Sequence, residues 1–157
     1  MHSVIRYIKE NYSYAIVGHC SEQGCKLILD CLSRFSGSVI LKGEELGTSD
    51  KICDYLIFLG NSKITICAIE MKGKNWASDK VNKKLENGRI EAQKIIRKTK
   101  QSISKEQISF IPVLLKRGRN PSDVKQLQKD RNRIGKQSII IGDCGSCLSQ
   151  VLEIKNL

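Results

Sequence analysis

The sequence predicts an α/β protein in which a central mixed β-sheet is flanked by helices on both faces. Two observations lead to this fold class. After an initial hairpin, apolar runs typical of strands alternate with segments of helical periodicity. The chain of 157 residues is also long enough for one domain with a real core, and too short for two comfortable ones. We therefore expect a single domain spanning residues 1–157.

The first third of the chain is predicted to form two helices and one short strand. Apolar residues recur at helical spacing in residues 3–12 and again in residues 22–36, where Gly37 ends the second helix. The segment "SVILKG" (38–43) is typical of a short strand. A polar connection at 44–51 then leads into the middle of the chain.

The middle of the chain is predicted to be a β-hairpin followed by a long helix. Two apolar runs, 53–59 and 64–72, flank the turn sequence "GNSK", which is the pattern of a hairpin. Residues 79–101 then place apolar side chains on one side of a helix and cover the rest with Lys and Arg.

The last third alternates strands with short helices. The continuous apolar run at 108–116 predicts a strand buried on both faces. Asn120 and Pro121 have the pattern of an N-cap and a first helical position, which predicts a short helix to about Lys129. A further strand is expected at 137–142, and the closing stretch "DCGSCLSQVLEI" is expected to contain a last helix.

Three charged residues stand at the open end of the predicted hairpin. Glu70 and Lys72 share one face of their strand because they are two residues apart, and a simple register sets Asp54 opposite residue 69 or 70. Two carboxylates at close range repel unless a cation lies between them, and Mg²⁺ binds carboxylates, waters and phosphate oxygens. The alternative is an ion triad at a sheet edge in which Lys72 neutralises both acids. The apolar surroundings of the acids favour a metal-assisted site for phosphodiester hydrolysis.

The positive charge lies almost entirely in the second half of the chain. Residues 1–71 contain 7 Lys and Arg against 8 Asp and Glu, whereas residues 72–157 contain 20 against 8. A one-sided basic field attracts phosphate backbones, although a solvated basic surface is the simpler interpretation. Seven residues are candidates for nucleic-acid contact: Lys74, Asn75, Arg89, Lys94, Arg97, Arg117 and Arg119.

The stretch "DYLIFLGNSKITICAIEMK" resembles the core motif of the PD-(D/E)xK nuclease superfamily. In that motif an Asp begins one hairpin strand and (D/E)-x-K ends the next, and these positions match Asp54, Glu70 and Lys72. Cys53 replaces the usual Pro before the Asp. The resemblance implies a restriction-endonuclease-like fold and phosphodiester cleavage that depends on Mg²⁺ or Mn²⁺.

Two supporting site residues follow from the same resemblance. Archaeal Holliday junction resolvases and their relatives have a metal-associated Glu near the start of the first helix, which matches Glu22, although Glu44, Glu45 and Asp50 are closer rivals in sequence. Many superfamily members have a Gln in the helix after the core, which matches Gln93. The implied metal ligands are therefore Glu22 and the two hairpin acids.

The seven cysteines do not predict a disulfide framework, because their number is odd and no export signal precedes them. Cys31, Cys53 and Cys67 lie in apolar runs and are expected to pack as small hydrophobic residues. The other four fall in two pairs that we interpret mainly as structural. A zinc or iron–sulfur site, or a redox pair, is the alternative. These four are Cys20, Cys25, Cys144 and Cys147.

The sequence thus leads to three hypotheses about function. The first is a metal-dependent nuclease that acts on DNA rather than RNA. The second is a non-catalytic nucleic-acid-binding module on the same fold, and the third is a cysteine-ligated metal protein. We expect a cytoplasmic protein with no membrane partner, since the sequence shows no secretory signal and no apolar span of membrane length. A symmetric homodimer is an option by analogy with one-domain nucleases.

Overall fold

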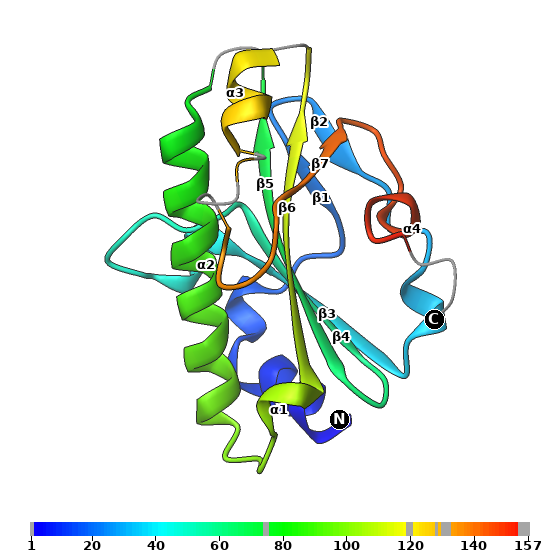
Figure 1. Ribbon diagram of the computed structural model, residues 1–157. Helices are drawn as coiled ribbons and strands as arrows, with labels where there is room; N and C mark the ends of the chain where they lie inside the picture. Colours follow the sequence, from blue (N-terminus) through cyan, green and yellow to red (C-terminus); the bar gives the residue numbers. More distant parts are fainter. Residues whose placement is uncertain (1, 74–75, 119–120, 128, 130–132, 154–157) are drawn as a thin grey trace.

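The computed structural model describes residues 2–73, 76–118, 121–127, 129 and 133–153 (Figure 1). These residues form a five-stranded mixed sheet, a separate two-stranded hairpin and four α-helices. The predicted α/β class is therefore confirmed. None of the described helices is long and apolar enough to cross a membrane.

The five-stranded sheet has the strand order β3-β4-β5-β6-β7. Its strands are β3 (Gly37–Lys42), β4 (Tyr55–Gly60), β5 (Ile64–Lys72), β6 (Ile108–Lys116) and β7 (Ile140–Asp143). The first three pair antiparallel and the last three pair parallel. The carboxyl ends of β3, β5, β6 and β7 therefore meet the amino end of β4 at one edge, which we call the charged edge. All five strands were predicted from the sequence.

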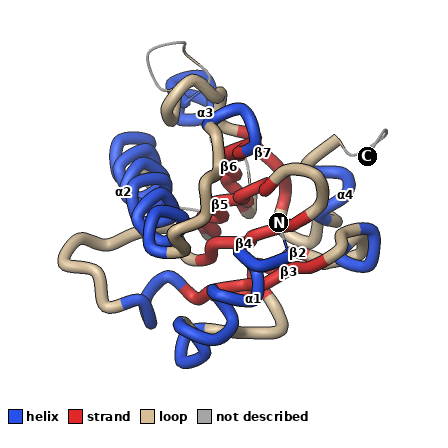
Figure 2. The backbone as a smooth tube through the Cα atoms, turned by 90° about the horizontal axis from the view of Figure 1, so that it is seen from below, coloured by secondary structure: helices blue, strands red, loops and turns tan. Residues whose placement is uncertain are grey.

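Helices cover one face of this sheet. They are α1 (His2–Asn11), α2 (Ser78–Lys98) and α3 (Pro121–Leu127). Apolar residues of all three join the same buried cluster as Leu56 of β4 and Ile66 of β5. Figure 2 shows α2 lying along this face of the sheet. The predicted helices at 3–12 and 79–101 are thus confirmed in position, and α2 follows β5 closely enough to lie beside the charged edge.

The opposite face is covered by a β-hairpin and the short helix α4 (Leu148–Val151), not by a second long helix. The hairpin consists of β1 (Cys20–Glu22) and β2 (Cys25–Leu27), so the helix expected at 22–36 is wrong. Gln23 and Gly24 have φ angles of 50° and 76° and form the two-residue loop. A turn with two positive φ values matches the twist of paired strands and excludes a helix at this point.

Several smaller predictions are corrected in detail. The connection after β3 begins with a 3₁₀ turn, η3 (Gly43–Leu46), and the other 3₁₀ turns are η1 (Ser13–Ala15), η2 (Leu32–Arg34) and η4 (Lys105–Gln107). The strand predicted to be buried on both faces is only partly so, since residues 112–115 of β6 are buried and residues 108–111 are half-buried. The N-cap expected at Asn120 lies outside the described residues.

An early and a late segment of the chain are joined by a disulfide between Cys25 and Cys144, whose Cα atoms are 4.9 Å apart. The sequence had argued against disulfides, so this is a correction. The bond joins the β1–β2 hairpin to the loop after β7. Backbone hydrogen bonds from Gly145 N–H to Lys26 O (2.7 Å) and from Ile28 N–H to Ser146 O (2.9 Å) strengthen the same junction.

Candidate active site

Glu70 is a fully buried carboxylate at the charged edge, with a relative exposure of 0%. Its Oε1 lies 2.7 Å from Nζ of Lys72 and 3.0 Å from Nζ of Lys84. Its Oε2 is buried and has no hydrogen-bond partner among the described residues. A buried carboxylate oxygen without a partner costs free energy, so this atom marks a position where a cation would be stabilising.

Asp54 lies beside Glu70, as the hairpin register predicts. Tyr55 pairs with Ile69, which sets the preceding Asp54 opposite Glu70. Oδ2 of Asp54 accepts a hydrogen bond of 2.7 Å from the backbone N–H of Met71. Burial and the negative charge of Glu70 raise the pKa of Asp54 to about 6, although the Met71 hydrogen bond and the Lys84 charge oppose the shift. Asp54 therefore changes charge close to neutral pH.

Lys84 is a site residue that the sequence did not single out. It projects from α2 and shares Oε1 of Glu70 with Lys72. Burial alone would lower the pKa of Lys84, but its hydrogen bond to Glu70 and the charges of Glu70 and Asp54 raise the pKa overall. Lys84 stays protonated at neutral pH for this reason. Two ammonium groups thus face two carboxylates at the charged edge.

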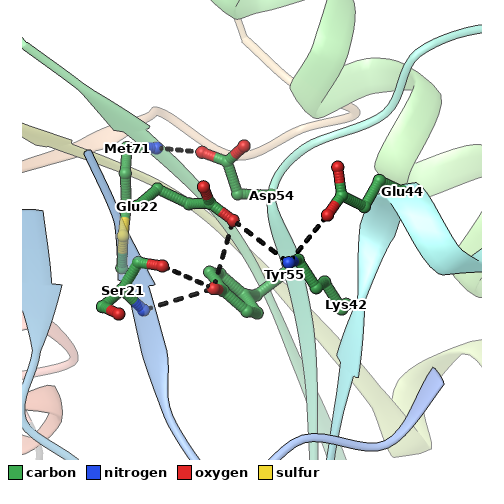
Figure 3. Close-up of polar contacts among 7 residues, drawn as sticks. All are labelled: Ser21, Glu22, Lys42, Glu44, Asp54, Tyr55 and Met71. Carbon is green, nitrogen blue, oxygen red and sulfur yellow. Dashed lines mark hydrogen bonds and ion pairs between the residues drawn. The ribbon is translucent and has the colours of Figure 1, made fainter.

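Glu22 also reaches this region, but from the end of β1 rather than from a helix. Its carboxylate accepts a 3.3 Å hydrogen bond from the hydroxyl of Tyr55, and that hydroxyl also donates to Ser21 O at 2.8 Å. Nζ of Lys42 lies 3.9 Å from Oε1 of Glu22 and 2.7 Å from Oε1 of Glu44 (Figure 3). Glu22 and Asp54 line the same pocket, and the negative charge of Glu22 makes a small contribution to the raised pKa of Asp54.

An open pocket of about 330 Å³ gives access to part of this cluster. Glu22, Asp54 and Lys84 line it together with residues 43–44 and 48–53, and Glu70 lies outside the lining because it is fully enclosed. No group of three or more His, Cys, Asp or Glu side chains in the described part of the chain is arranged to hold a metal. A divalent cation here would therefore rely on one or two carboxylates, with water and phosphate as its other ligands, which is the usual arrangement for Mg²⁺.

Gln93 does not belong to this site. It is exposed on α2, and it lines a different pocket with Lys63 and Ile66 near the amino end of β5. Lys84 and Gln93 are nine positions apart, which is roughly 13 Å along a helix axis. The site role expected for Gln93 is therefore wrong.

The candidate nucleic-acid contacts fall into three groups. Arg89 is ion-paired with Glu86 on α2, Lys94 lies 3.9 Å from Glu91, and Arg97 is exposed. Arg117 follows β6 at the charged edge, where its side chain donates a hydrogen bond to Gly24 O. Three candidates lie outside the described residues: Lys74, Asn75 and Arg119.

The four cysteines proposed as a metal site are not brought together as four thiolates. Cys25 and Cys144 are joined in the disulfide, so neither is a free ligand. Cys20 is buried, where burial raises the pKa of its thiol to about 12, and Cys147 is partly exposed before α4. Burial likewise raises the pKa of Cys67, whose nearest thiols are Cys31 and Cys20. The arrangement supports the structural interpretation of these residues.

Fold and site together define an α/β protein with a cluster of carboxylates and lysines at the edge where four strands end. Ligands of open α/β sheets commonly bind at such an edge. Comparison of the chain with protein-family models, with curated proteins and with solved structures gives no match in any of the three.

Proposed function

We propose that this protein is a metal-dependent nuclease that hydrolyses phosphodiester bonds, in DNA rather than RNA, on a restriction-endonuclease-like fold. The observation behind the proposal is Glu70, a fully buried carboxylate with one oxygen held by two lysines and the other without a partner among the described residues. The ion pairs with the two lysines leave Oε2 buried without a partner in the described part of the chain, and coordination of a cation would offset this cost.

The charge balance is compatible with a divalent cation that binds together with its substrate. Asp54 and Glu70 are offset by Lys72 and Lys84, so the cluster is close to neutral when both acids are ionised. Adding Mg²⁺ or Mn²⁺ would leave an excess of two positive charges. That excess matches a phosphodiester together with a hydroxide.

In the proposal, Asp54 and Glu70 hold the metal, and Glu22, which lines the same pocket as Asp54, supports the site with its negative charge. The bound ion would supply an activated water and would polarise the phosphate. Lys72 is 24% exposed in its side chain, so its ammonium can offset charge on a phosphate or orient the attacking water. Lys84 holds the same oxygen of Glu70 as Lys72 does, and it would orient this carboxylate toward the ion.

The test is a cleavage panel of single-stranded, double-stranded and branched DNA, together with RNA, in the presence of Mg²⁺ or Mn²⁺. We expect Glu70→Gln to reduce cleavage by more than about a hundredfold, because loss of an outer-shell partner alone costs 10- to 100-fold. The matched control is Glu91→Gln on α2, whose carboxylate contacts only the exposed Lys94 among the ion pairs of the described residues. Equal cleavage by wild type and Glu70→Gln would refute the assignment.

A second candidate function is a non-catalytic nucleic-acid-binding module on the same fold. The observation in its favour is that the described residues contain no group of three metal-ligating side chains, while two lysines already neutralise the acids. Such a module would bind nucleic acid with a steep salt dependence and cleave none of the substrates in the panel.

The proposed setting is the cytoplasm, and the proposed assembly is a symmetric homodimer whose two sites address two strands. Light scattering on the purified protein measures the assembly directly. A monomer at the concentrations used for cleavage would exclude the dimer without affecting the nuclease assignment.

A further inference from the structure

A second pocket, rich in basic groups, lies next to the candidate active site on the charged edge. It has a volume of about 370 Å³ and is formed by three segments: the β1–β2 hairpin, the end of β6 and the loop after β7. Its cationic groups are Lys26, Lys116 and Arg117, and its one acidic group is Asp143. We call it the basic pocket.

The basic pocket and the active site lie at the ends of neighbouring strands of the sheet. Lys72 of β5 pairs with Lys116 of β6 in the parallel register, and adjacent strands lie about 4.8 Å apart. The backbone N–H of Arg117 also donates to Lys72 O at 3.0 Å. A nucleic-acid strand with one phosphate at Lys72 would therefore present its neighbouring phosphates to this pocket.

The basic pocket is held in place by several contacts. The Arg117 guanidinium donates to Gly24 O, and Gly24 has a positive φ of 76°, which favours glycine at this turn position. Cys144 N–H donates to Lys116 O at 3.0 Å. The Cys25–Cys144 disulfide joins two of the three walls. An arrangement fixed in this way loses little entropy when it binds a ligand.

The charge of the basic pocket suits an anion. Three cations face one carboxylate, that of Asp143, which is 83% exposed and lies 3.3 Å from Nζ of Lys116. Lys26 and Arg117 have no acidic partner among the ion pairs of the described residues, whereas Arg89 and Lys94 on α2 each have one on their own helix. Arg side chains in particular match the geometry of phosphate oxygens.

We infer that the basic pocket binds phosphates that flank the reacting phosphate, so that a nucleic-acid strand crosses the ends of β5 and β6 instead of running along α2. The inference rests on the proposed function for its partner class. It changes the expected binding surface from the α2 residues to Lys26, Lys116 and Arg117.

The experiment is fluorescence anisotropy with labelled single-stranded and duplex DNA in EDTA, where no metal-dependent cleavage occurs, over a series of salt concentrations. Arg117→Ala and Lys26→Ala should each weaken binding several-fold and reduce the salt slope by about one. Asp143→Asn should tighten binding, because it removes the one acidic group of the pocket. The matched control is Lys9→Ala on α1, an exposed lysine remote from the charged edge, which should leave affinity unchanged.

Several binding results would overturn the inference. Unchanged affinity in Arg117→Ala and Lys26→Ala, or losses confined to Lys94→Ala and Arg97→Ala, would place the strand elsewhere. Binding of poly-glutamate with the same affinity as DNA would show that the pocket attracts any polyanion and does not recognise phosphates. Lys26 is exposed and, unlike Arg117, has no hydrogen bond to Gly24 among the described residues, so Lys26→Ala remains informative if Arg117→Ala disturbs folding. Weaker binding by both variants, with no cleavage by wild type in the Mg²⁺ panel, would refute the nuclease and leave the binding surface as inferred. Cleavage by wild type, with unchanged affinity in both variants, would refute the inferred binding surface and leave the nuclease assignment intact.

Discussion

At the scale of single residues, Asp54 gives the charged edge a dependence on pH. Asp54 has a pKa of about 6 because of burial and the nearby Glu70 charge, whereas an Asp in the unfolded chain titrates near pH 3.8. The folded state therefore holds the Asp54 proton more tightly than the unfolded state between about pH 4 and pH 6. The contribution of Asp54 to stability falls as the pH rises through this window.

This difference in pKa leads to a prediction for Asp54→Asn. The amide keeps an oxygen that can accept the Met71 N–H but has no ionised form. At pH 8 the variant should be more stable than wild type by roughly 2–3 kcal/mol, since one pKa unit corresponds to about 1.4 kcal/mol. At pH 3.5 the gain should be absent. Thermal unfolding of both proteins from pH 3.5 to pH 8 measures this, and a gain that does not vary with pH would contradict it.

Added Mn²⁺ gives the same pair of proteins a second readout. A cation bound by Asp54 and Glu70 stabilises the folded state of wild type in proportion to the logarithm of its concentration. Mn²⁺ should therefore raise the melting temperature of wild type at pH 8 and leave that of Asp54→Asn nearly unchanged. An equal rise in both proteins would place the cation elsewhere.

The sequence identified some of these residues and missed others for physical reasons. Asp54, Glu70 and Lys72 were found because strand alternation fixes which side chains share a face. Lys84 was missed because it lies in a run of lysines on a helix. It is three positions after Val81 and four before Gly88, both buried, so helical spacing did place it on the inner face of α2.

At the scale of elements, the sequence fails where a local turn competes with a helical pattern. Leu27, Ile28 and Cys31 recur at helical spacing, yet Cys20, Cys25 and Leu27 are buried in the strands of a hairpin. The deciding signal is Gln23-Gly24, a two-residue loop with positive φ at both positions. Tertiary burial of one hairpin face against the sheet then outweighs helical propensity. Gln93 was expected at the site on the basis of the family resemblance. A resemblance gives the order of the elements along the sequence, but it does not give the position of a residue along the axis of its helix.

The packing of α2 onto the sheet depends on one glycine. A Cβ built on Gly88 would lie 2.5 Å from Sγ of the fully buried Cys53, immediately before Asp54. In an exposed helix, Gly→Ala stabilises by about 1 kcal/mol. Here we expect Gly88→Ala to destabilise by roughly 1–3 kcal/mol, because overpacking forces α2 away from the sheet. Chemical denaturation with urea measures the free energy of unfolding.

A double-mutant cycle separates this steric effect from a general loss of helix stability. Cys53→Ala removes the sulfur that the new methyl group would meet. The double variant Gly88→Ala/Cys53→Ala should therefore be more stable than the sum of the two single changes implies, by roughly 0.5–3 kcal/mol. Strict additivity would show that Gly88 is not required by close packing.

At the scale of the whole molecule, the charged edge is assembled from segments far apart in sequence. Glu22 comes from the nearly neutral first half of the chain, and Lys116 and Arg117 come from the basic second half. Hydrophobic patterns predict the order of the elements, because each pattern is local. They do not predict that the hairpin and the loop after β7 meet, because that contact joins residues 119 positions apart.

The disulfide that closes this long loop gives the last prediction. A cross-link that closes a loop of about 100 residues lowers the entropy of the unfolded chain. In the chain-entropy model this loss stabilises the folded state by roughly 4–5 kcal/mol, and the measured stabilisation is typically about 2–4 kcal/mol. Reduction of Cys25–Cys144 should therefore lower the melting temperature of wild type by roughly 5–15 °C. Calorimetry with and without a dithiol reductant measures the change. Cys147→Ser, which keeps the disulfide, should respond to reductant as wild type does, whereas Cys25→Ala/Cys144→Ala should not respond. A wild type that melts at the same temperature in both conditions would show that the hydrogen bonds at Lys26 and Ile28 hold this junction without the disulfide.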